Sequence, residues 1–308
     1  MAFRFSPDVG FFNSNGEFSQ NTVGDDIENP WAVATQIINN TQTDNARTNL
    51  YADLKILEGL NFKTTFGFRT QNGTEGYFKP QTFLLSQGGA FLENVQRRGI
   101  LSENYLTYNR QLGAGNITAT VGHSYQKNTT TGFEAGAREL ISDVFSFHNL
   151  EVGQIDQRTV DSRFSESEIE SVFGRVNFDW ADRYLLTATV RRDGASNFAA
   201  NNRFATFPSF AVGWKVSREP FFADDGVVSN LKLRASWGLT GNQAIGPFES
   251  LATFNVQPPA EVDGAFGVEL AREANPDLKW ETSAQTNIGF DLGPVSYTHL
   301  TLPTIYSV

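Results

Sequence analysis

The sequence predicts an all-β protein, namely part of an antiparallel transmembrane β-barrel. Apolar and polar residues alternate with a period of two along several stretches, which is the pattern of strands with one apolar and one polar face. These stretches are roughly 9 to 13 residues long, as a tilted strand needs to cross a bilayer, whereas globular strands are usually about 5 to 6. Short and long connections also alternate along the chain, which is typical of outer-membrane barrels.

Composition excludes several classes of function. The chain has 308 residues, no Cys, 3 His and a formal net charge of −10. The acidic balance argues against a nucleic-acid partner, which would need a basic patch. The absence of Cys excludes a disulfide framework, a zinc–thiolate site and a Cys nucleophile. The chain contains no run of about 18 apolar residues, so no transmembrane helix is predicted. This does not argue against a barrel, because the apolar and polar residues of alternating strands cancel in a hydropathy average.

The first part of the chain is predicted to be a loop followed by a hairpin. Residues 1–45 lack sustained alternation and are rich in Asn, Gly, Asp and Thr, and Asn29-Pro30-Trp31 is expected to form a turn. Leu and Ile then alternate with polar residues over 49–56, and Leu and Phe do so over 60–69. Glu58-Gly59 is the predicted turn between these two strands.

A second hairpin follows a polar connection. Residues 72–100 are expected to form this connection, with a short strand near 91–97. Gly113-Ala114-Gly115 then joins a strand over 101–112 to a strand over 117–126, of which the second alternates more clearly.

The clearest alternation of the chain lies between Val172 and Val216. After a polar stretch over 128–167, the strands predicted at 172–180 and 184–191 are joined by the turn Ala181-Asp182-Arg183. A third strand is predicted over 204–216.

The last part of the chain adds two strands. Residues 217–229 form a compact connection that can hold one helical turn, and alternation resumes over 231–239. A long connection over 241–279 precedes the final strand at 280–292. This gives about nine strands, which should not close into a barrel alone, because single-chain bacterial barrels use an even number and open edges promote aggregation.

Five aromatic residues are predicted to lie at the membrane interface, because amphipathic rings gather where barrel strands meet the headgroups. These residues are Trp180, Tyr184, Trp214, Trp237 and Trp280. The alternative is a soluble β-sandwich, acting as a carbohydrate-binding or adhesive module, in which the same rings fill a core. That alternative predicts a monomer in buffer that needs no detergent.

Three segments resemble the SusC/RagA family of TonB-dependent transporters from the outer membrane of Bacteroidota. They are YLLTATVRRDGASNFAANNRFATFPSFAVGWKVSREPFF, SNLKLRASWGLTGNQAIGPF and NPDLKWETSAQTNIGFDLG, within residues 168–293. The resemblance implies a barrel of about 22 strands that surrounds a plug domain. It also implies import of oligosaccharides or peptides across the cell outer membrane, with a SusD-like surface lipoprotein and TonB as partners and no cofactor.

The resemblance covers only part of such a protein. The chain starts without the pattern of a secretory signal, and neither a plug nor a TonB-contacting segment is found. Residues 1–293 are therefore predicted to be a fragment of the barrel, and TonB would act through a segment that is absent here. Residues 294–308 break the alternation and are interpreted as a non-native tail, the alternative being a divergent loop.

No enzymatic site is predicted. His123 lies on the apolar face beside Tyr125, and Ser124 points to the opposite face, so they do not form the Ser–His pair of a barrel hydrolase. His148 lies in a polar loop and His299 in the tail. His123 is expected to lie at the membrane interface or beneath a loop.

No metal or substrate site is assigned either. Asp224-Asp225-Gly226 and Asp25-Asp26 lack the spaced oxygen ligands of a calcium loop. Arg191-Arg192-Asp193-Gly194 is interpreted as a salt-bridged rim of the lumen in preference to a substrate contact.

Overall fold

The computed structural model describes residues 5–6, 8–20, 27–83, 87–222, 228–257, 267–294, 300–301 and 304–307. The acidic pairs Asp25-Asp26 and Asp224-Asp225, together with His299, lie outside the described residues. The same holds for much of the predicted non-native tail, whose interpretation stays a prediction.

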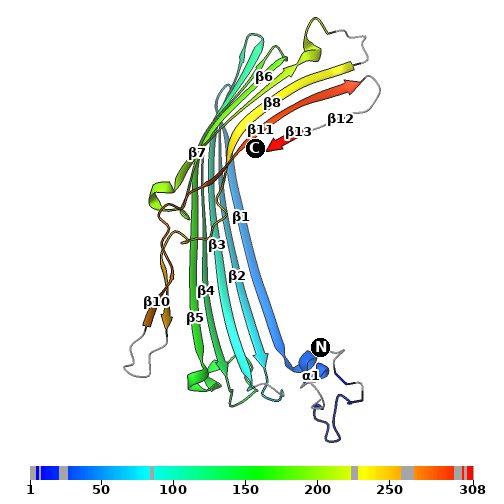
Figure 1. Cartoon of the computed structure of the whole chain (residues 1–308), viewed down its shortest axis with the longest axis vertical. Coiled ribbons are helices and arrows are strands. Elements are labelled where there is room, and N and C mark those ends of the chain that lie inside the picture. Colours follow the sequence, from blue (N-terminus) through cyan, green and yellow to red (C-terminus); the bar gives the residue numbers. More distant parts are fainter. Residues whose placement is uncertain are drawn as a thin grey trace. The chain divides into compact units, whose positions relative to one another are not determined.

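Nine strands of 12 to 24 residues form one sheet in the described part of the chain (Figure 1). Neighbours in sequence are neighbours in the sheet up to β8, which then pairs with β11. The pairs β5–β6, β6–β7, β7–β8 and β8–β11 are all antiparallel. The nine strands are β1 (Ile38–Leu57), β2 (Leu60–Lys79), β3 (Gly89–Leu112), β4 (Gly115–Arg138), β5 (Thr159–Trp180), β6 (Tyr184–Ala195), β7 (Phe204–Lys215), β8 (Val228–Asn242) and β11 (Glu281–Pro294).

Four shorter strands complete the β structure. β9 (Thr253–Gln257) and β10 (Gly267–Arg272) form a separate antiparallel hairpin. β12 (Leu300–Thr301) and β13 (Thr304–Ser307) both pair antiparallel with β11. No helix among the described residues is long and apolar enough to cross a membrane.

The helices are short. Asn29 caps α1 (Pro30–Gln36), since its side chain accepts hydrogen bonds from the backbone of Trp31 and Ala32, and Pro30 fits the first helical position. The turn predicted at Asn29-Pro30-Trp31 is therefore the start of a helix. Single 3-10 turns are η2 (Leu150–Val152), η3 (Ile155–Gln157), η4 (Ala200–Asn202) and η5 (Val216–Arg218), of which η5 is the helical turn expected after the third strand.

Three of the predicted short connections are turns of two or three residues, at 58–59, 113–114 and 181–183. The connection predicted to be long near residue 85 has only nine residues, fewer than the twelve between β7 and β8, which were predicted to be compact. Gly59 and Gly113 adopt φ of 80° and 60° in two short turns, and Ala181 and Asp182 adopt φ of 54° and 53° in a third. A left-handed backbone reverses the chain within two or three residues, and glycine adopts it without a steric penalty.

Most strands are longer than predicted, chiefly at the end away from the short turns. β1 begins at Ile38 instead of near residue 49, and β5 begins at Thr159 instead of near residue 172. The added residues are largely polar on both faces, so they show no alternation of apolar and polar residues. The strand expected near 91–97 is the start of β3.

The chain divides into two compact units, each with a small apolar cluster. The first unit comprises residues 1–47, 69–98 and 129–165, and the second comprises 48–68, 99–128 and 166–308. The cluster of the first unit is Phe78, Ala90, Ala137, Leu140 and Phe147, and that of the second is Ala195, Phe198, Phe207 and Trp280.

Most large apolar side chains of the sheet belong to neither cluster. Leu186, Val190, Phe210 and Val212 are all about half exposed. In the described residues no second sheet covers them, as a β-sandwich would require.

Candidate functional site

The second unit presents one apolar and one polar face of the sheet. Residues that lie opposite each other in adjacent antiparallel strands share a face. Trp180 lies opposite Tyr184, and Tyr184 lies opposite Trp214 on its other side. Leu233 and Phe290 continue this row across β8 and β11. One edge of the apolar face is therefore a row of five large side chains.

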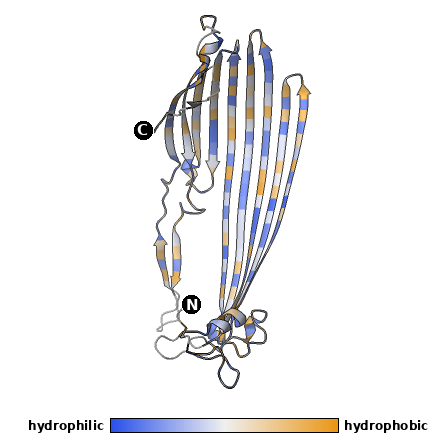
Figure 2. Ribbon diagram, turned by 90° about the vertical axis from the view of Figure 1, so that its right-hand side faces the viewer, coloured by the Kyte–Doolittle hydropathy of each residue, from blue (hydrophilic) through white to orange (hydrophobic). Residues whose placement is uncertain are grey.

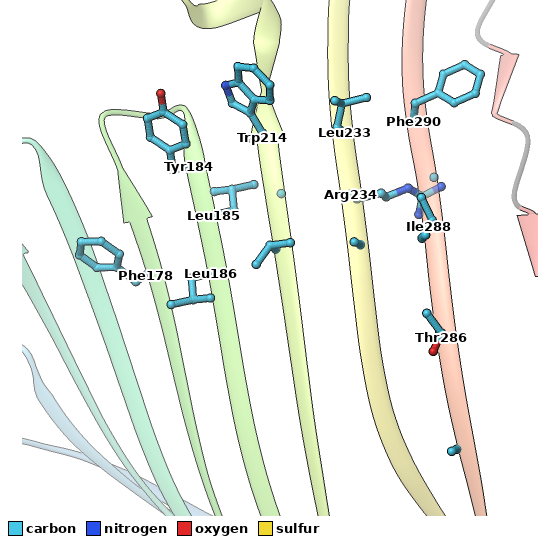
Figure 3. Close-up of a pocket in the computed structure, with 15 residues that line it drawn as sticks. Phe178, Tyr184, Leu185, Leu186, Trp214, Leu233, Arg234, Thr286, Ile288 and Phe290 are labelled. Carbon is cyan, nitrogen blue, oxygen red and sulfur yellow. The ribbon is translucent and has the colours of Figure 1, made fainter.

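The rows that follow along the strands are apolar as well. The next row joins Phe178, Leu186, Val212, Ala235 and Ile288. Figure 3 shows side chains of both rows lining a groove of about 1160 Å³ on this face. A groove walled mainly by hydrocarbon offers few groups to orient a polar ligand, so it fits acyl chains better than a soluble substrate.

The opposite face of the same strands is polar, and Figure 2 shows the alternation of hydropathy along the strands. The row Asn177, Thr187, Ala211, Ser236 and Asn287 crosses five strands. The Thr187 hydroxyl donates to Asn177 Oδ1 over 2.9 Å. Such a surface stays hydrated or meets other polar groups, as the lumen wall of a barrel does.

The apolar face ends sharply at the level of Val172. Arg192 lies opposite Val172, and the positions before Val172 on the same face of β5 are Glu170, Glu168 and Glu166. Between Val172 and Trp180 the strand has the roughly 9–11 residues that a tilted strand needs to cross a bilayer. The apolar face is therefore a band of membrane width, bounded by aromatic rings on one side and charges on the other.

A hydrogen bond and two ion pairs occupy the charged edge of this band. His123 Nε2 lies 3.0 Å from Glu170 Oε1, and Lys127 Nζ lies 2.8 Å from Glu168 and 2.9 Å from Glu166. His123 lies inside β4 and not near the end of a strand, because β4 extends to Arg138, and its interfacial position stays a prediction. Ser124 lines a pocket on the polar face, as the alternation predicts.

Glu219 holds the aromatic edge in place. Its Oε1 accepts hydrogen bonds from the Tyr184 hydroxyl over 2.6 Å and from Trp214 Nε1 over 2.9 Å, while Arg183 Nη1 lies 3.3 Å from Oε2. Those two hydrogen bonds and the Arg183 charge lower the pKa of Glu219 below its ordinary value. Glu219 was missed from the sequence, since nothing there indicates that it meets residues 35 positions away.

The five predicted interface aromatics occupy three different places. Trp180, Tyr184 and Trp214 share the row at the edge of the band. Trp237 is also exposed on the apolar face, but it lies four residues beyond Leu233 along β8 and hence inside the band. For the first three residues a membrane-interface position stays a prediction.

Trp280 differs from what the sequence predicts. Its side chain is 9% exposed and packs against Phe198 and Phe207, with ring centroids 5.0 and 5.5 Å away. Its Nε1 donates to the backbone oxygen of Arg203 over 2.8 Å. A ring buried in this way cannot contact headgroups, because the connection between β6 and β7 covers it.

The salt bridge expected in the Arg191–Gly194 segment is present on the polar face. Arg191 Nε lies 2.6 Å from Asp193 Oδ1, and Arg191 Nη2 donates to Ser171 Oγ over 2.8 Å. Arg192 lies on the other face, with its guanidinium 5.2 Å from the centre of the Phe204 ring. No group of three or more His, Asp or Glu in the described residues could hold a metal ion.

Comparison with known proteins shows which family has this architecture. Residues 2–306 match the family described as TonB dependent receptor-like, beta-barrel. The chain belongs to this family. TonB-dependent receptor P3 of Formosa agariphila is 44% identical over 295 residues, which are 94% of this chain and 29% of that protein. SusC of Bacteroides thetaiotaomicron is 31% identical, covering 92% of this chain and 28% of its own length.

Solved structures show the same fold. The RagAB peptide transporter matches with a TM-score of 0.81 at 24% identity, over 92% of this chain and 32% of the compared chain. The chain thus spans about a third of the length of the relatives it matches. Its nine-stranded sheet is part of a TonB-dependent receptor barrel, the fold that the alternation predicts. Barrels of this family are outer-membrane proteins.

Proposed function

We propose that this chain is a section of the wall of an outer-membrane importer of the SusC type. The apolar band would contact lipid, with Trp180, Tyr184 and Trp214 at the periplasmic interface. The polar face would line the lumen through which the substrate passes. The observation that carries the proposal is the separation of apolar and polar residues onto opposite faces over the width of one bilayer.

The whole importer would act with partners. We infer that it works with TonB and with a SusD-like surface lipoprotein, and that it imports oligosaccharides or peptides into a Bacteroidota-like cell. The support is its similarity to a relative named SusC and to a solved structure described as a peptide transporter. If the intact gene product is purified from its native outer membrane, a SusD-like lipoprotein should copurify, and its absence would contradict this partnership.

Insertion into lipid vesicles tests the orientation of the wall. Phe210 lies in the middle of the apolar band, opposite Ala188 and Trp237, and its neighbour Ala211 lies on the polar face. Arg at the midplane of a barrel's lipid face costs about 2–4 kcal/mol, so Phe210→Arg should insert far less than the original chain. Ala211→Arg, the matched control, should insert like the original chain.

Flotation with phosphatidylcholine vesicles after dilution from urea measures this insertion. The proposal predicts that the original chain and Ala211→Arg float with the vesicles and that Phe210→Arg remains mostly behind. A chain that stays monomeric in buffer, or two variants that insert equally, would contradict it.

A further inference from the structure

A pocket of about 320 Å³ lies on the polar face of the second unit, apart from the apolar band. Side chains from β3 to β6 form most of its wall, including Glu103, Ser171, Arg191 and Asp193. Gln243, just after β8, and Trp280 close another side. Residues from six separate segments of the chain thus converge on one polar cavity.

The cation in this pocket is already engaged. Arg191 donates to Asp193 over 2.6 Å and to Ser171 over 2.8 Å, and its guanidinium lies 5.8 Å from the centre of the Phe173 ring. Ser171 is only 1% exposed, so one end of the guanidinium is fixed against the wall. A guanidinium group that is held at two of its three nitrogens and lies over an aromatic ring is a rigid part of the site.

The same pocket contains an unpartnered acceptor and more negative than positive charge. Gln243 Oε1 is buried and has no hydrogen-bond partner in the described part of the chain. Glu103 and Asp193 contribute two carboxylates against the single guanidinium of Arg191, which leaves one negative charge in excess. A buried acceptor without a donor is costly, so a ligand that supplies donors and a positive charge would complete this site.

We propose that this pocket binds a primary ammonium group, such as the amino terminus or a lysine side chain of a peptide. An ammonium group has three donors, no acceptor and one positive charge, which matches the unpartnered oxygen of Gln243 and the negative charge of the wall. A neutral sugar supplies hydroxyl donors without the charge. The inference rests on the proposed function, because it takes the polar face as part of the substrate path, and it favours peptides over neutral glycans.

Equilibrium binding to the 308-residue chain in micelles of a detergent without sugar headgroups tests the inference. The probes are tetra-alanine amide with a free amino terminus, its N-acetylated analogue, N-acetylated Ala-Lys-Ala-Ala amide and maltohexaose. Tetra-alanine amide should bind through its amino terminus, and N-acetylated Ala-Lys-Ala-Ala amide should bind through its lysine side chain. Loss of the charge by acetylation should weaken binding about 10- to 100-fold, as expected for charge-assisted hydrogen bonds.

Two pocket variants and one control localise the binding. Glu103→Gln and Gln243→Leu should each weaken binding of tetra-alanine amide about 10-fold or more. Glu170→Gln removes a carboxylate from the apolar-face edge of the same unit and should leave binding unchanged.

Equal binding of free and acetylated peptide, binding of maltohexaose alone, or absence of binding by every probe would each overturn the inference. Vesicle flotation of the same preparation separates this failure from failure of the proposed function. If the chain inserts into vesicles but shows no preference for ammonium probes, the proposed barrel wall stands and the ammonium site is wrong.

Discussion

Glu219 stabilises one edge of the sheet through three polar contacts from residues on two strands and a turn. Without Glu219, the polar atoms of Tyr184 and Trp214 would be free to choose other partners. By accepting both hydrogen bonds at one oxygen, Glu219 fixes the two rings beside each other. A carboxylate that is only 8% exposed and hydrogen-bonded in its charged form has a lowered pKa, which makes stability depend on pH.

Replacement of this carboxylate should remove that pH dependence. Because the pKa of Glu219 is lower in the folded chain, its contribution to stability is present above its ordinary value of 4.5 and is lost as the pH falls through the folded value. Glu219→Gln should therefore unfold at lower urea concentration than the original chain at pH 7, and the difference should shrink as the pH falls below 4.5.

Tryptophan fluorescence during urea unfolding in micelles measures this difference. Glu58→Gln, at an exposed position in the β1–β2 turn, is the control and should match the original chain at pH 7 and at pH 3. A difference that persists unchanged at pH 3 would show that Glu219 acts through packing and not through its charge.

For single residues, the sequence predicts the face of the strand on which a side chain lies better than it predicts what covers that side chain. The alternation placed Trp180, Tyr184 and Trp214 on the apolar face, where the structure has them. It could not show that the connection between β6 and β7 folds over Trp280, since that contact joins residues 77 positions apart. Burial of a single ring depends on the loop that covers it, and local periodicity carries no information about that loop.

Turns between strands depend on backbone conformation and on the space beside the turn. Gly59 and Gly113 both adopt positive φ in short turns, but their surroundings differ. A Cβ on Gly59 would lie 2.2 Å from the backbone oxygen of Asn109, whereas a Cβ on Gly113 would meet nothing within 4 Å. The two turns therefore separate the cost of the conformation from the cost of a clash.

Alanine at each glycine should show these two costs. Gly113→Ala should lower the free energy of unfolding by about 1–2 kcal/mol, the cost of a left-handed backbone with a side chain. Gly59→Ala should lower it by about 1–3 kcal/mol more, because the Asn109 carbonyl must move. Urea unfolding in micelles compares the two variants, and equal losses would contradict the role of the close contact.

The turns could be predicted from the sequence, whereas the far ends of the strands could not. A short turn needs glycine or another residue that tolerates positive φ, and such residues stand out between two alternating runs. The outer part of β1, Ile38 to Arg47, carries polar residues on both faces and lacks that contrast. Strands that leave the bilayer lose the apolar face that makes them visible in the sequence.

The whole sheet is consistent only with an apolar environment that the chain itself does not supply. Its two buried clusters are small, while the large apolar side chains of β5 to β8 and β11 remain exposed. An exposed apolar band of this extent would cause aggregation in water. Lipid is the environment that matches its width and its aromatic edge.

Lipid accessibility along β6 tests this account most directly. The chain has no Cys, so a single cysteine can be placed and spin-labelled at each position from Leu185 to Val190 in vesicle-inserted protein. Labels at Leu186, Ala188 and Val190 should collide with oxygen, which concentrates in lipid, and labels at Leu185, Thr187 and Thr189 should collide with a water-soluble nickel chelate. Accessibility that does not alternate along the strand, or labels at Leu186, Ala188 and Val190 that are shielded from oxygen, would contradict a lipid-facing wall.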